Sequence, residues 1–293
     1  MKIKELFDKD GLFLSFEVFP PKKDSNFENV RKATHEVAKL HPSFVSVTYG
    51  AGGGTSKYTL EIAENLLETE NVPTMAHLTC VSSTHENVHA QIEAIKAAGI
   101  ENIMALRGDL TPELEARDRS TWDYHHASEL VKEIRESGYD FCIGGACYPE
   151  IHPESANQKE DIEHLKEKVD AGCDFLTTQM FFDNNLLYNF LYKIREAGIT
   201  APVVPGIMPI TNAKQVERSI KLSGSFMPQR FKSLVDKFGD DPAAMKQAGI
   251  AYATDLIIDL YANGIKNVHV YSMNKPDVAA AIQNNLSDII TVY

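Results

Sequence analysis

The stretch Asn-Ile-Met-Ala-Leu-Arg-Gly-Asp at residues 102–109 is a short apolar run that ends in an arginine, a glycine and a carboxylate. A run of this length, followed by a loop and a helical pattern, is typical of a buried parallel strand. Parallel sheets and barrels carry their chemistry at the carboxyl ends of their strands. The stretch therefore indicates both the fold and the place to look for functional groups.

The same pattern recurs along the chain, where strand-like runs alternate with helical runs through short connections. The predicted strands are residues 12–19, 44–49, 74–81, 102–106, 141–147, 175–178, 203–207 and 266–271. The predicted helices are residues 24–40, 56–67, 84–98, 123–136, 158–171, 185–197 and 276–285, with several more inside 211–263. Because no linker divides the chain, we expect one α/β domain over residues 1–293, a TIM-type (β/α)8 barrel with extra helices before the last strand.

The composition restricts the class of protein. Hydrophobic residues make up 43% and charged residues 24% of the chain, as in a globular enzyme. The net charge of −12 argues against a nucleic-acid partner, because a phosphate backbone needs a basic surface. No run approaches the roughly 20 apolar residues of a membrane span, and the charged start lacks the features of a signal peptide. We expect a cytoplasmic protein with no membrane partner, and a homo-oligomer.

Polar groups occupy the ends of six successive predicted strands. A purely packing role would not require acids, a histidine, an arginine, an amide and a phenol at these positions. Because the strand ends meet at one mouth of a barrel, we expect a ligand to fill it. In chain order the residues are Glu17, Thr48, His77, Arg107 with Asp109, Tyr148 and Gln179.

Glu17 is the residue of this set best suited to acid–base chemistry, because it stands among aromatic neighbours just before two prolines. A desolvated carboxyl there would stay protonated near neutral pH and serve as a general acid. A solvated carboxyl would be an ordinary rim carboxylate. The residues alone leave both interpretations open.

Metal and redox motifs are weak in this chain. Residues 85–89 match HExxH, which can present two imidazoles to zinc, but they open a helix without a third ligand nearby. We therefore expect a solvated helix start and no metal site. The four cysteines form no CxxC pair, so we expect buried thiols in a reducing compartment.

A glycine-rich run, Gly-Ala-Gly-Gly-Gly at residues 50–54, follows the second predicted strand. It lacks the GxGxxG spacing of a dinucleotide loop, and no acid ends the next strand. We expect a glycine wall that lets a flat ring approach the backbone.

The chain resembles methylenetetrahydrofolate reductases of the compact bacterial type along nearly its whole length. The resemblance is carried by FEVFPP at 16–21, TYGAGG at 48–53, ALRGD at 105–109, YPEIHPE at 148–154, KVDAG at 168–172, TQMFFD at 178–183 and VPGIMPI at 204–210. Several such blocks in this order are highly specific. The resemblance implies a barrel oxidoreductase of one-carbon metabolism, without the regulatory adenosylmethionine-binding domain of eukaryotic relatives.

The resemblance also implies FAD at the barrel mouth and reduction of 5,10-methylenetetrahydrofolate to 5-methyltetrahydrofolate with NADH or NADPH. Glu17 would protonate folate N10, so that the ring opens to an iminium cation that accepts hydride from reduced flavin. Asp109 would lower the flavin potential, and Gln179 and Lys275 would contact the folate together with Glu17 and Asp109. The implied flavin-binding residues are Thr48, His77, Arg107, Gly108, Asp109, Tyr148, His152, Asp161 and Lys168. For Asp161 and Lys168 the alternative is an exposed i,i+7 helix pair.

Two positions depart from the family pattern. Ala213 stands where the family carries an aromatic that helps to hold both substrates, and Lys275 stands where it carries an arginine that meets the folate. Lysine keeps the charge but loses the bidentate fork. The missing aromatic leaves ferredoxin or a partner flavoprotein open as the electron source, with Phe226 as a possible substitute. A barrel lyase or aldolase using Glu17 and Lys275 fits the bare residues but not the ordered blocks.

Overall fold

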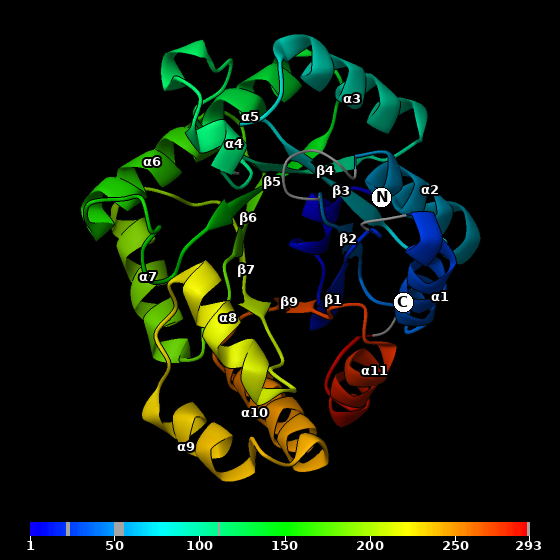
Figure 1. The fold of residues 1–293 in the computed structure, drawn as a ribbon, viewed down its shortest axis with the longest axis vertical. Coiled ribbons are helices and arrows are strands. Elements are labelled where there is room, and N and C mark those ends of the chain that lie inside the picture. Colours follow the sequence, from blue (N-terminus) through cyan, green and yellow to red (C-terminus); the bar gives the residue numbers. More distant parts are fainter. Residues whose placement is uncertain (22–23, 50–55, 111, 292–293) are drawn as a thin grey trace.

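The strands form one parallel sheet that closes into a barrel (Figure 1). The computed structural model describes residues 1–21, 24–49, 56–110 and 112–291. The sheet order is β7-β6-β5-β4-β3-β2-β1-β9-β8, and the short β7 and β8 belong to one segment that joins its two ends. The strands are β1 (Phe13–Val18), β2 (Val45–Val47), β3 (Thr74–Thr79), β4 (Asn102–Leu106), β5 (Cys142–Cys147), β6 (Phe175–Thr178), β7 (Val203–Val204), β8 (Gly206–Ile207) and β9 (Asn267–Tyr271). This arrangement confirms the predicted TIM-type barrel.

Helices surround the strands on the outside (Figure 1). Several begin at a side chain that accepts a hydrogen bond from the first turn, as Thr84, Asn157 and Asp183 do. The crossover before β9 contains α8, α9 and α10, as the sequence predicts. The helices of five residues or more are α1 (Phe27–Ala38), α2 (Ser56–Glu70), α3 (His85–Ala97), α5 (Ala127–Glu136), α6 (Gln158–Asp170), α7 (Asn184–Glu196), α8 (Ala213–Ser223), α9 (Gln229–Phe238), α10 (Pro242–Ala262) and α11 (Pro276–Asn285).

The predicted strand 203–207 is wrong as a single element, because it breaks at Pro205. Proline has no N–H to continue a ladder. The chain changes partner there: the Gly206 N–H donates to Thr178 Oγ1 at 2.8 Å, and the Pro205 carbonyl accepts the His269 N–H at 2.9 Å. One segment thus bonds to β6 on one side and to β9 on the other.

Two predicted helix starts are also wrong. The helix predicted from residue 123 begins at Ala127, because the Glu129 carboxylate accepts the N–H groups of His125 and His126 and holds them outside the helix. The helix predicted from residue 24 begins at Phe27, after a 3-10 turn η2 (Asp24–Asn26). The long loop between β4 and α5 contains two short elements, α4 (Pro112–Glu115) and η4 (Arg119–Thr121). The glycine-rich run 50–54 lies outside the described residues.

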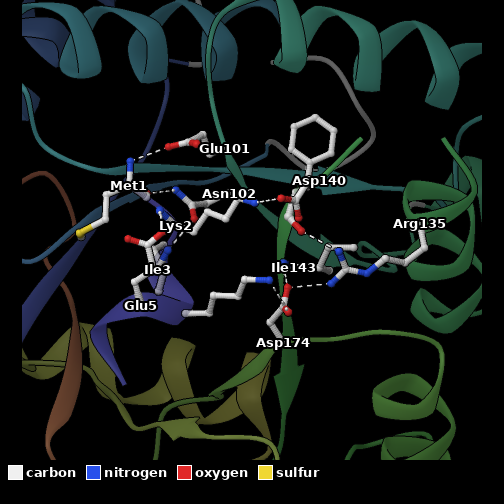
Figure 2. Close-up of polar contacts among 12 residues, drawn as sticks. Met1, Lys2, Ile3, Glu5, Glu101, Asn102, Arg135, Asp140, Ile143 and Asp174 are labelled. Atoms are coloured by element: carbon white, nitrogen blue, oxygen red, sulfur yellow. Dashed lines mark hydrogen bonds and ion pairs between the residues drawn. The ribbon is translucent and has the colours of Figure 1, made fainter. Parts of the chain in front are cut away.

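The amino end of the barrel is sealed by the start of the chain. Ile3 and Leu6, in the 3-10 helix η1 (Ile3–Leu6), are fully buried in a cluster of side chains from the amino ends of the strands. Figure 2 shows the polar contacts that hold this segment: the Ile3 N–H donates to Asn102 Oδ1 at 2.8 Å, and Lys2 pairs with Asp140. The Asn102 amide also donates to the carbonyls of Met1 and Thr74, both at 3.2 Å. The opposite end of the barrel carries the predicted functional groups.

The cysteines are as predicted. All four are free and buried. Burial raises the pKa of Cys80, Cys142 and Cys147 to about 12, so these thiols are protonated and inert at neutral pH. Among the described residues, no helix is long and apolar enough to cross a bilayer.

Candidate active site

Glu17 lies inside the barrel near the carboxyl end of β1 and is only 8% exposed. Its nearest polar neighbours are His77 Nε2, 3.6 Å from Oε2, and Ser46 Oγ, 3.5 Å from the same oxygen. Burial raises the pKa of Glu17 to about 8, and hydrogen bonding to Ser46 works in the opposite direction. The alternative of a solvated rim carboxylate is therefore wrong, and the carboxyl is protonated at neutral pH.

His77, on β3, faces the Glu17 carboxyl. Burial lowers the pKa of His77 to about 3, so the ring is neutral and offers the acid no counter-charge. Its Nε2 is buried and has no hydrogen-bond partner among the described residues. An unpartnered ring nitrogen beside a neutral carboxyl is a polar group left to a ligand.

The interior also contains polar residues that the sequence reasoning missed. His269, on β9, lies with Nε2 2.9 Å from Ser46 Oγ and Nδ1 2.7 Å from Ser15 Oγ, and its ring stacks on Phe44. Tyr271, two residues further along β9, donates its hydroxyl to the Thr178 carbonyl. Strand alternation could have found them, because residues 15 and 17 and residues 267, 269 and 271 share the inward face of their strands.

Around the mouth, Arg107 forms a two-pronged ion pair with Glu154, with N–O distances of 2.6 and 2.7 Å. The rings of Tyr148 and His152 meet edge to face at 4.6 Å between centroids. Burial raises the pKa of Tyr148 to about 12, and burial and the Arg107 charge lower the pKa of His152. These residues from β4, β5 and the loop after β5 form one side of the mouth.

Asp161 and Lys168, on α6, do not form the exposed pair that was the alternative to flavin binding. Asp161 accepts the His152 N–H at 3.2 Å and the Ser155 hydroxyl at 3.1 Å, so it fixes the loop after β5. Lys168 donates its ammonium to the Ala146 carbonyl at 2.6 Å, and burial lowers its pKa. Lys168 therefore places a positive charge beside the last residues of β5.

The residues expected to hold the folate lie at the same end of the barrel. Gln179 follows β6, and its Oε1 accepts the Met180 N–H at 2.8 Å. Asp109 is exposed three residues after β4. Lys275 follows β9 and donates to Thr211 Oγ1 at 2.9 Å. Thr48, which was expected to contact the flavin, follows β2, and its carbonyl accepts the Thr59 hydroxyl at 2.9 Å.

Phe226 lies near this mouth. Its side chain is 58% exposed, and its N–H donates to both carboxylate oxygens of Glu150, at 2.8 and 3.0 Å. The hydroxyl of Ser225 next to it donates to the Met180 carbonyl at 2.7 Å. Ala213 is the first residue of α8. An exposed aromatic ring thus stands on a segment anchored to the loops after β5 and β6.

The HExxH residues connect two helices. His85 Nδ1 lies 2.8 Å from Glu133 Oε2, and His89 Nε2 lies 3.4 Å from Glu133 Oε1, so both rings of α3 contact one carboxylate of α5. Tyr124 donates its hydroxyl to the same carboxylate. In the described part of the chain, no three His, Cys, Asp or Glu side chains are arranged to hold a metal ion.

Known proteins share this sequence along nearly its full length. A family model described as methylenetetrahydrofolate reductase matches residues 2–287. Methylenetetrahydrofolate reductase (NADH) 1 of Zea mays is 36% identical over 97% of this chain, which spans about half (50%) of the maize protein. The 5,10-methylenetetrahydrofolate reductases of Pectobacterium carotovorum and Escherichia coli are 34% and 33% identical over 93% of this chain, and 89% and 90% of their lengths are covered.

Solved structures resemble the fold at low sequence identity. A Clostridium thermocellum protein described as binding two copies of 5-methyl-5,6,7,8-tetrahydrofolic acid superposes with a TM-score of 0.65 at 13% identity, covering 98% of this chain and 99% of that one. An oxaloacetate acetylhydrolase superposes with a TM-score of 0.54 at 12% identity, covering 98% of this chain and 86% of that one. At such identities the likeness concerns the fold alone.

A closed parallel barrel with a buried acid and polar groups at the carboxyl ends of its strands defines a barrel enzyme. The comparisons identify its family: the chain belongs to the methylenetetrahydrofolate reductases. These enzymes are oxidoreductases and are generally flavin-dependent.

Proposed function

We propose that the protein uses FAD to reduce 5,10-methylenetetrahydrofolate to 5-methyltetrahydrofolate, with Glu17 as the general acid. The observation that carries the proposal is the buried, protonated carboxyl of Glu17 inside the mouth of a barrel of this family. Only a likeness of fold supports the lyase or aldolase alternative. The acetylhydrolase and lyase structures that resemble this barrel are only 8–13% identical to this chain.

The residues present fit a flavin dinucleotide in three respects. Arg107 offers a guanidinium fork for a phosphate, and the partly buried Lys168 adds a second positive charge behind β5. Gly108 has a positive φ of 92°, and a Cβ there would lie 3.0 Å from Thr79, so its bare backbone leaves room beside the strand end. His77 Nε2 lacks a partner among the described residues. Bound FAD would supply the hydride.

Glu17 would give its proton to N10 of the bound folate, because an acid with a raised pKa transfers its proton readily near neutral pH. Proton transfer to N10 opens the five-membered ring and leaves an iminium cation at N5. Asp109 would stabilise that cation with its negative charge. The same charge would favour the oxidised flavin and so lower the flavin potential. Gln179 would hydrogen-bond the pterin, and Lys275 would attract a folate carboxylate as a single cation.

The first test compares the two half-reactions in Glu17→Gln. The substitution removes the transferable proton with little change of shape, so we expect at least a hundredfold loss of folate reduction with flavin content and nicotinamide oxidation retained. Glu61→Gln on the exposed face of α2 is the matched control. A purified protein that is colourless and cannot take up FAD would overturn the proposal. Equal losses in both half-reactions would remove Glu17 from the role of acid.

The electron donor is proposed to be NADH, in line with the name of the maize relative. The alternatives are NADPH, reduced ferredoxin or a partner flavoprotein, because Ala213 cannot supply the aromatic of the family pattern. Anaerobic mixing of the FAD-loaded protein with NADH, NADPH or reduced ferredoxin distinguishes these donors, since only the true donor bleaches the flavin within the turnover time. Bleaching by ferredoxin but not by NADH would reject the nicotinamide proposal.

A further inference from the structure

Four buried side chains form a line across the barrel interior beneath the mouth. Ser46 Oγ lies 3.5 Å from Glu17 Oε2 and 2.9 Å from His269 Nε2. On the other side of the ring, His269 Nδ1 lies 2.7 Å from Ser15 Oγ, and Ser15 Oγ lies 3.2 Å from the Val268 carbonyl. Long hydrogen bonds to a catalytic acid are common without substrate and tighten when it binds. The line therefore connects the acid to a backbone carbonyl.

Counting hydrogens allows two arrangements of this line, since each serine has one hydroxyl hydrogen and a neutral imidazole has one N–H. With Glu17 protonated, the carboxyl donates to Ser46, Ser46 donates to Nε2, Nδ1–H donates to Ser15, and Ser15 donates to Val268. With Glu17 ionised, the directions between Ser15 and Glu17 reverse: Ser15 donates to Nδ1, Nε2–H donates to Ser46, and Ser46 donates to the carboxylate, while the Val268 carbonyl gives up the Ser15 hydrogen.

We propose that His269 is a positioning residue for Glu17, and that its neutral ring changes tautomer, through Ser46, whenever the Glu17 carboxyl gains or loses its proton. The catalytic meaning of this coupling rests on the function proposed above. The proton given up by Glu17 goes to the acceptor in the mouth. The line as a whole loses only that proton: the ring has one N–H hydrogen in each state, at Nδ1 in the first and at Nε2 in the second, so it carries no charge in either.

The surroundings keep the ring neutral. Of the residues that the structure describes, His77 from β3 and Tyr271 from β9 are the titratable groups that face Glu17 and His269, and neither is a cation at neutral pH. Burial, with the nearby His77, lowers the pKa of His269 to about 3. Because the pKa of Glu17 is raised to about 8, the change of tautomer falls near pH 8, far above any protonation of the ring.

The coupling has a purpose for an acid that must return to its starting state. A buried carboxyl that keeps one hydrogen-bond partner in both protonation states does not have to move between them. A fixed donor would serve only the carboxylate, and a fixed acceptor would serve only the acid. The imidazole serves both, because its two nitrogens exchange roles.

The test is the 15N spectrum of the imidazoles in the FAD-loaded full chain, recorded from pH 6 to pH 10. The signals of His269, one of 10 histidines, are assigned by their absence in His269→Phe. We expect the Nδ1–H tautomer at low pH and the Nε2–H tautomer at high pH, with a midpoint near 8. A single tautomer over the whole range in the wild-type protein would overturn the proposal.

Two variants establish the path. Ser46→Ala should abolish the change of tautomer, and Glu17→Gln should hold one tautomer at all pH values, because neither variant can relay a titration. Ser43→Ala is the matched control, since Ser43 is also buried but donates to the Leu14 carbonyl, away from His269. A change that survives in Ser46→Ala would overturn the proposal, and so would its loss in Ser43→Ala.

Kinetics give an independent readout. In His269→Phe the Ser46 hydrogen has only the Glu17 carboxyl as its acceptor in this line, which favours the carboxylate. We expect the pH profile of folate reduction to move down by about one unit, a tenfold change in the ionisation constant. An unmoved profile would remove the positioning role and leave the acid role intact. A normal tautomer change in a protein that never reduces folate would overturn the proposed function and leave the coupling.

Discussion

Three buried residues of the barrel interior, Glu17, His77 and His269, make the stability of the fold depend on pH. The unfolded carboxyl ionises near pH 4.5 and the folded one near 8, so between these values the folded state alone holds the proton, and stability falls as pH rises. The two histidines have their pKa lowered from 6.5 to about 3, so in that window the unfolded state holds more protons and stability rises with pH.

These opposite slopes predict a stability maximum near pH 6.5. Above it only Glu17 acts, and the free energy of unfolding should fall by about 2 kcal/mol up to pH 8. Below it the two histidines outweigh the single carboxyl. Urea unfolding of wild type and Glu17→Gln at half-unit pH steps checks this. The variant should lose the decline above pH 6.5 and show an acid-side slope about twice as steep, because the opposing carboxyl is gone; a decline that persists in the variant would show that another group causes it.

At the scale of the elements, closure of the barrel depends on the broken segment β7–β8. A Cβ on Gly206 would lie 2.2 Å from the Tyr271 hydroxyl oxygen and 2.6 Å from the Thr178 carbonyl oxygen. We expect Gly206→Ala to destabilise the fold by about 3 kcal/mol, because both neighbours are fixed by their mutual hydrogen bond. Adding Tyr271→Phe should recover part of the loss, since it removes the shortest clash and leaves those with the ring carbon Cζ and the Thr178 carbonyl oxygen, both at 2.6 Å. Denaturant midpoints measure the stability of the single and the double variant. Full stability in Gly206→Ala would contradict the close packing at the β7–β8 segment.

At the scale of the whole molecule, the barrel separates stability at its amino end from chemistry at its carboxyl end. Leu6 is fully buried in the amino-end cluster, so Leu6→Ala should cost about 3 kcal/mol of unfolding free energy. Flavin affinity at ambient temperature should stay unchanged, because the mouth lies at the other end. Ile289→Ala, at a residue 38% exposed, is the control and should cost less than about 0.5 kcal/mol. Weaker flavin binding in Leu6→Ala would show that the two ends are coupled.

The predicted homo-oligomer belongs to the same scale. Sedimentation velocity of the flavin-loaded protein tests it. A single species at the mass of one chain, 32.6 kDa, would reject it.

The sequence predicted the barrel because strand-like and helical runs alternate along the chain, and it predicted a ligand-binding mouth because the strand ends are polar. It failed where one residue's geometry decides: a proline that breaks a strand, or the Glu129 carboxylate that delays a helix. Burial of Glu17 was also out of reach, since it depends on side chains from β2, β3 and β9 that are distant in sequence. His269 was missed because attention to the last residue of each strand passes over the layer beneath it.

The ion pair between Arg107 and Glu154 means that the mouth already contains an anion where a phosphate group would bind. A phosphate arriving at the guanidinium exchanges with a carboxylate of this chain instead of meeting a bare cation, and the local charge count at Arg107 hardly changes. The exchange releases few counterions, so the cofactor should be retained in concentrated salt far better than an open cationic site would allow.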